Sequence, residues 1–63
     1  MGIQTSKGRV WVDYFYSLRN AAAFARRVKA GIVVNGEYGQ FWVTTIRGAS
    51  RLMADGYELA NVL

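Results

Sequence analysis

The segment from Gly31 to Thr45 combines the turn dipeptide Asn35-Gly36 with the densest run of β-branched and aromatic residues in the chain. A two-residue type I′ turn needs positive φ at both central positions, which Asn and Gly tolerate better than other residues. The sequence therefore predicts a β-hairpin at this segment. In that hairpin Val34 and Glu37 form the closing pair.

This register divides the second strand of the hairpin into two faces, because successive side chains of a strand point to opposite sides. Phe41 and Val43 lie on an apolar face with Gly39, which predicts contact with the core. Trp42 lies on the other face with Tyr38, Gln40 and Thr44. The register thus predicts an outer sheet face that is aromatic and polar.

Two strand-helix units flank the predicted hairpin. Residues 1–8 lack periodicity and predict a loose arm, whereas residues 9–16 alternate as a strand does. Ser17 is a good N-cap for a helix that runs to about Ala30, where Gly31 provides the stop. We therefore expect a strand and a helix before the hairpin.

The second unit begins with Thr44 or Thr45, either of which can cap a shorter helix that ends at Asp55-Gly56. Gly48 inside this helix costs about 1 kcal/mol relative to alanine, so it weakens the helix. Residues 57–63 then predict a final strand. The second unit thus mirrors the first as a helix followed by a strand.

The order strand, helix, hairpin, helix, strand predicts a ferredoxin-like βαββαβ fold in the α+β class. It would be one domain, residues 1–63, with a four-stranded antiparallel sheet and both helices on one face. A chain this short is marginally stable without disulfides, metals or oligomerisation. Because the sequence has no Cys and no His, we expect a homodimer.

The absence of Cys and His also limits the catalytic and metal-binding chemistry that this chain can perform. Without His and Cys the chain lacks the commonest general base, the thiol nucleophile and the usual transition-metal ligands. The carboxylates come from different predicted elements, and none is spaced for an acid-base pair or a calcium loop: Asp13, Glu37, Asp55 and Glu58. We expect a protein that is not an enzyme and that has no cofactor or metal.

Positive charge is the strongest compositional signal. The formal net charge is +4, and six of the eight Lys and Arg residues lie in the first 31 residues. The predicted helices carry five arginines on their outer sides, as a candidate partner-binding surface: Arg19, Arg26, Arg27, Arg47 and Arg51. Such a surface attracts an acidic protein or a nucleoprotein assembly.

A second candidate surface is the outer face of the predicted sheet. It would carry aromatic rings beside one cation, namely Arg9, Trp11, Phe15, Tyr38 and Trp42. A sheet with aromatic side chains on its central strands resembles the RNA-recognition motif, in which such rings stack bases. The segment Tyr38-Gly39-Gln40-Phe41 differs from the aromatic-Gly-aromatic pattern of that family by one extra residue. Because large exposed rings more often mark protein contacts, we expect this face to be a core or dimer contact, ahead of a partner-protein surface or a base-stacking platform.

Three functions fit these patterns. The first is a small binding module that occupies a surface of a larger assembly through its basic helix face, as inhibitors from bacteriophages and mobile elements do, anti-CRISPR proteins among them. The second is a single-stranded DNA or RNA binder, and the third is an accessory structural dimer. No apolar run approaches the ~20 residues of a membrane span, so we expect a cytoplasmic protein without a membrane partner.

Overall fold

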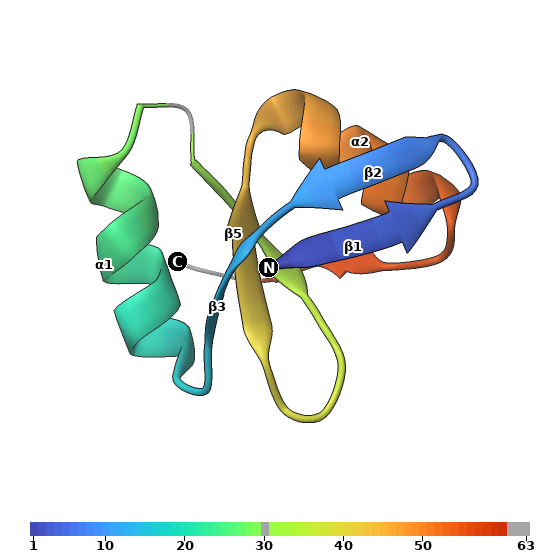
Figure 1. Ribbon diagram of the computed structural model, residues 1–63. Helices are drawn as coiled ribbons and strands as arrows, with labels where there is room; N and C mark the ends of the chain where they lie inside the picture. Colours follow the sequence, from blue (N-terminus) through green and yellow to red (C-terminus); the bar gives the residue numbers. More distant parts are fainter. Residues whose placement is uncertain (30, 61–63) are drawn as a thin grey trace.

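A four-stranded antiparallel sheet separates two layers in the computed structural model, which describes residues 1–29 and 31–60 (Figure 1). The strand order is β3 (Asp13–Phe15), β5 (Phe41–Thr44), β4 (Ile32–Asn35) and β6 (Glu58–Leu59). Helix α1 (Leu18–Arg27) covers one face of this sheet.

The opposite face is covered by helix α2 (Ile46–Ala54) together with a two-stranded sheet. That second sheet consists of β1 (Gly2–Thr5) and β2 (Gly8–Trp11), which pair antiparallel. The prediction of a single four-stranded sheet with both helices on one face is therefore wrong. The α+β class is correct.

The turn of the β4-β5 hairpin explains much of this difference. The backbone N–H of Gln40 donates to the carbonyl of Glu37 at 3.0 Å, and the two residues between them, Tyr38 and Gly39, have φ of 57° and 76°. Two positive φ values in this position are the signature of a type I′ turn. The turn therefore falls at Tyr38-Gly39 and not at the predicted Asn35-Gly36.

Moving the turn changes which side chains share a face. Val34 pairs with Trp42, whereas the predicted closing partner was Glu37, five residues earlier. Because side chains alternate with a period of two, an odd shift places Trp42 on the same face as Val34. Gly36 has a different role from the one predicted: a Cβ atom there would lie 2.6 Å from Cδ2 of Trp42, so the missing side chain makes room for the indole.

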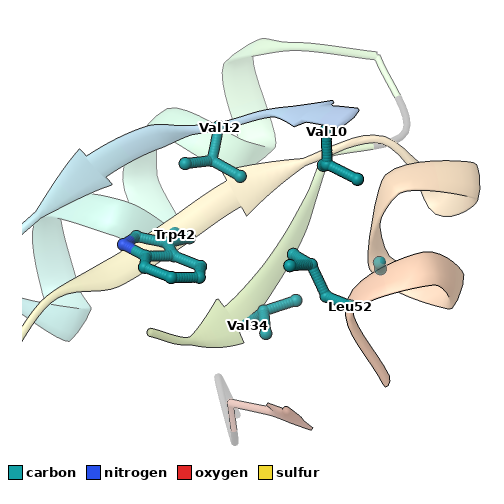
Figure 2. Packing of buried hydrophobic residues seen from close by; sticks show 6 residues of the cluster. Val10, Val12, Val34, Trp42 and Leu52 are labelled. Carbon is teal, nitrogen blue, oxygen red and sulfur yellow. The ribbon is translucent and has the colours of Figure 1, made fainter. Parts of the chain in front are cut away.

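Both faces of the sheet are therefore buried. Figure 2 shows Trp42 and Val34 facing Val10, Val12 and Leu52, which come from the β1-β2 hairpin, its exit and α2. The other face packs Val33 and Val43 against Ala21 of α1. The predicted contrast between a buried and an open face is absent.

The N-terminal residues are part of the core around Trp42 and do not form the predicted loose arm. The N-terminal ammonium of Met1 donates to the carbonyl of Val12 at 2.8 Å, and Val12 returns a backbone bond to Met1. The predicted strand 9–16 is split at Val12, which is fully buried where β2 leaves the small sheet and β3 enters the large one. Trp11 and Phe15 consequently belong to different sheets.

Both predicted helix caps are confirmed. The Oγ of Ser17 accepts from the N–H of Asn20 at 3.2 Å, and Oγ1 of Thr45 accepts from the N–H of Gly48 at 3.0 Å. Helix α1 ends at Arg27, before the predicted end at Ala30, which lies outside the described residues, as do residues 61–63 of the predicted last strand.

Tyr57 packs against the core around Trp42 and makes stability sensitive to alkaline pH. Its ring lies 5.2 Å from that of Trp42, and its hydroxyl donates to Oε2 of Glu37 at 2.6 Å. This hydrogen bond to a carboxylate, with desolvation second, raises the pKa of Tyr57 from 10.0 to about 12.

The folded protein therefore holds the phenol proton more tightly than the unfolded chain does. The resulting stabilisation is complete below pH 10 and is lost as the pH rises towards 12. We expect the free energy of unfolding, measured by urea denaturation between pH 8 and 11.5, to fall more steeply in the wild type than in Tyr57→Phe. Parallel curves for the two proteins would contradict this assignment.

Candidate polyanion-binding groove

The five arginines predicted to form one basic helix face lie on opposite sides of the molecule. Arg19, Arg26 and Arg27 are exposed on α1. Arg47 and Arg51 project from α2, which lies across the sheet from α1. The structure thus replaces the predicted surface with two separate groups of cations.

The predicted aromatic face is not formed either. Trp42 is 2% exposed, and its Nε1 donates to Oε1 of Gln40 at 2.9 Å. Phe15 is half-buried with its ring 5.3 Å from that of Phe24 on α1. Trp11 is 69% exposed on β2, and Tyr38 is 91% exposed in the β4-β5 turn. These four rings therefore do not form one stacking surface on the large sheet.

A groove runs over the outer side of α2 and brings together cations from two parts of the chain. It has a volume of about 590 Å³ and is lined by Ile46, Arg47, Ser50, Arg51 and Ala54 of α2 and by Lys7 from the β1-β2 turn. We call it the basic groove. Lys7 lines the groove although it lies forty positions before Arg47, the nearer of the two arginines in sequence.

Close packing of the β1-β2 hairpin on α2 positions Lys7 there. A Cβ atom on Gly48 would overlap Oγ1 of Thr44 and lie 3.0 Å from Cγ1 of Val10, so only glycine permits this approach. Position 48 of α2 therefore requires glycine, although glycine lowers the helix propensity of this segment. Gly48, which the sequence predicts as a weakness of the helix, is where the hairpin docks.

Polar contacts hold the hairpin at both ends of α2. At the C-terminal end, the backbone N–H of Ser6 donates to Oδ2 of Asp55 at 2.9 Å, and the Ser6 hydroxyl donates to Oδ1. At the N-terminal end, Oγ1 of Thr44, just before α2, donates to the carbonyl of Trp11 at 3.0 Å. Strand β2 thus lies antiparallel to α2.

Asp55 keeps its charge in this arrangement. The side-chain and backbone hydrogen bonds from Ser6 lower the pKa of Asp55, and the charge of Lys7 lowers it further. The carboxylate is therefore ionised at neutral pH and is engaged by the hairpin turn. Its role is to anchor the turn that carries Lys7.

Arg9 extends the positive charge from the groove onto the hairpin. Nη1 of Arg51 donates to the carbonyl of Arg9 at 3.4 Å, which ties the flank of α2 to the free edge of β2. The Arg9 side chain lies over Gly2 of the paired strand, where a Cβ atom would lie 2.9 Å from its Nε. Lys7, Arg47 and Arg51 thus line the groove, and Arg9 is a fourth cation whose side chain lies beside it on the hairpin.

The cations of α1 are arranged differently. A hollow of about 290 Å³ between α1 and β4 contains Arg26 among small apolar residues, and another of about 180 Å³ contains Lys29. Arg26 and Arg27 occupy the last turn of α1, where they favourably oppose the negative end of the helix dipole. Each hollow beside α1 therefore offers a single cation, in contrast to the basic groove.

Comparison of the chain with protein-family models, curated proteins and solved structures finds no match. Among residues 1–29 and 31–60, neither helix has the length and apolar character needed to cross a membrane. The same residues contain no group of three or more carboxylate side chains close enough together to hold a metal ion.

Proposed function

We propose that this protein is a non-enzymatic binding module that holds a polyanionic partner in the basic groove. The observation that carries the proposal is the convergence of Lys7 with Arg47 and Arg51 in the groove, through docking of the hairpin that also carries Arg9. Guanidinium groups bind phosphates and carboxylates through paired hydrogen bonds, and lysine adds a mobile point charge. The groove thus offers the donors that such a partner needs.

Screening favours a partner that makes several close contacts. At physiological ionic strength the Debye length is about 8 Å, so a distant charge contributes little. A single exposed ion pair contributes about 0 to 1 kcal/mol. Binding through this groove therefore requires a partner with closely spaced negative charges, as on a nucleic acid or an acidic protein surface.

The positions of the carboxylates support a binding role over catalysis. Asp55 is engaged by Ser6, and Glu37 accepts from Tyr57. Asp13 and Glu58 lie on β3 and β6, the two opposite edges of the large sheet. No two of these four side chains have a placement that suits general acid-base chemistry on one substrate.

Charge reversal at matched positions tests this proposal. Arg47→Glu/Arg51→Glu alters the groove, and Arg26→Glu/Arg27→Glu alters the far side of the sheet. Each exchange removes two units of charge, so both double variants have a formal net charge of zero, against +4 in the wild type. We expect the groove variant to elute from heparin at a clearly lower salt concentration than the α1 variant.

Circular dichroism would first establish that both variants keep the native fold. Equal elution of the two variants would mean that only net charge matters, and earlier elution of the α1 variant would move the binding surface to α1. Either result would contradict the proposal.

The biological setting is part of the same proposal. A module that covers a charged surface can inhibit the assembly to which that surface belongs, in keeping with an inhibitor from a bacteriophage or mobile element. The proposal includes a cytoplasmic location, where nucleic acids and nucleoprotein assemblies are found. A homodimer would leave the groove accessible if it formed through α1 or through the edge strand β3.

A further inference from the structure

We propose that the occupant of the basic groove is single-stranded nucleic acid, with a base stacked on Trp11 and the phosphates held by the four cations. This inference rests on the function proposed above and names its ligand. The carrying observation is that an exposed indole lies on the strand that docks against the basic helix.

The exposed indole of Trp11 does not contribute to either buried cluster of the fold. Its side chain is 69% exposed and is not part of either buried cluster, whereas Trp42 is 2% exposed. A large exposed ring commonly marks a contact surface. Because Trp11 alternates with buried Val10 along β2, its ring points to the outer side of the hairpin, as does the side chain of Arg9.

The backbone contacts of the hairpin place Trp11, Arg9 and the Lys7 turn in order along α2. Trp11 lies beside Thr44 at the start of α2, and the Lys7 turn lies beside Asp55 at its end, next to Ser6. The nine residues of α2 span about 13 Å, a length that a short single strand can follow. Arg9, Arg47 and Arg51 lie between these two ends.

The surroundings of the ring suit a base. Trp11, Thr44 and Thr45 line a hollow of about 180 Å³, and Ile46, which follows Thr45, lines the basic groove. Phe24, Val28 and Lys29 line the α1 side of this hollow, and the hollow is linked to the groove through the chain connection from Thr45 to Ile46. Asp13 also lines this hollow, so the phosphates are expected on the Arg47 side.

The combination of one exposed ring with several cations favours a single strand over the other polyanions. The bases of a duplex are stacked inside it and offer no face to an indole, and an acidic peptide gains little from the ring. Single-strand binders combine a positive groove with aromatic stacking platforms, and each stacked base contributes about 1 to 3 kcal/mol. Both features are present here on adjoining elements.

The test is a titration of the full chain with a twelve-residue oligothymidylate, a duplex of the same length and a poly-glutamate peptide of matched charge. Trp11 and Trp42 both emit, so the emission change is compared with that of Trp11→Phe, which keeps only the buried Trp42. We expect quenching by the single strand alone, with the logarithm of affinity falling against the logarithm of salt concentration with a slope of about −3 for four phosphate contacts.

Two substitutions separate stacking from charge. Trp11→Ala is expected to weaken single-strand binding about tenfold, and Trp11→Phe to restore most of the loss, because phenylalanine keeps an aromatic face. Arg26→Glu/Arg27→Glu serves as the control for net charge and is expected to bind more tightly than Arg47→Glu/Arg51→Glu.

Failure of this inference can be told apart from failure of the proposed function. If all three polyanions bind without quenching, and Arg47→Glu/Arg51→Glu abolishes binding, the groove binds anions but stacking on Trp11 is overturned. Preference for the duplex or the peptide overturns the inference in the same way. If none of the three binds, both the inference and the polyanion-binding function are overturned.

Discussion

Trp42→Ala is expected to lower the free energy of unfolding by about 3 to 5 kcal/mol, as truncation of a buried Phe or Trp does. The indole is 2% exposed, packs against Val10, Val12 and Val34, and stacks beside Tyr57. Small domains are stabilised by roughly 0.05 to 0.15 kcal/mol per residue, which is about 3 to 9 kcal/mol for a chain of this length. A large fraction of the variant should therefore be unfolded at 37 °C.

Trp11→Ala is the matched control, since it removes the same side chain from an exposed position of the same molecule. We expect a change within about 0.5 kcal/mol, as for most surface substitutions. Urea denaturation, monitored by circular dichroism, measures the free energy of unfolding of both variants. If the two variants were equally destabilised, or if only Trp11→Ala were, the indole of Trp42 would not be at the centre of the core.

Gly48→Ala is expected to destabilise the protein by about 1 to 3 kcal/mol, although helix propensity alone predicts stabilisation of about 1 kcal/mol. The added methyl group would overlap Oγ1 of Thr44 and press against Val10. Thr44 cannot turn away without losing its 3.0 Å hydrogen bond to the carbonyl of Trp11. The hairpin would then have to move away from α2.

Ser50→Ala on the same helix provides the comparison, because Ser50 is exposed and alanine there adds helix propensity without a clash. We expect this variant to be slightly more stable than the wild type. Hydrogen exchange would show whether the loss in Gly48→Ala is concentrated in β1, β2 and α2. Stabilisation by Gly48→Ala would mean that the hairpin does not pack on the helix at this point.

Local signals in the sequence predict the local structure well. Ser17 and Thr45 cap the two helices, and the strands at β4 and β5 occur where β-branched and aromatic residues cluster. These features depend on hydrogen bonds and backbone preferences within a few residues, which composition and spacing reveal directly. The α+β class follows from them.

The arrangement of the elements depends on one choice of turn. Asn35-Gly36 and Tyr38-Gly39 are both capable of a tight turn, and the preference for Asn-Gly favours the first. The second is formed because it pairs Trp42 with Val34 and lets Gly36 accommodate the indole. Burial of a large aromatic side chain outweighs the few tenths of a kcal/mol by which turn residues differ, and such burial is not visible in a local pattern.

The candidate site was only partly predictable for the same reason. Arg47 and Arg51 are four residues apart, so they lie on the same side of a helix and are recognisable as a basic pair. Lys7 and Arg9 join them because the N-terminal residues form a hairpin that docks on α2, a contact between distant parts of the chain. Gly48 was the available signal, since a glycine inside a helix often marks a close approach by another element.

Nuclear magnetic resonance offers the most direct test of where the partner binds. The chain has no proline, so every residue after the first has a backbone amide to observe. On titration with oligothymidylate, we predict shifts concentrated in residues 6–11 and 45–54, together with the indole resonance of Trp11, while Arg19, Arg26 and Arg27 of α1 remain unchanged. Shifts concentrated at Arg19, Arg26 and Arg27, with residues 45–54 unaffected, would contradict binding through the basic groove.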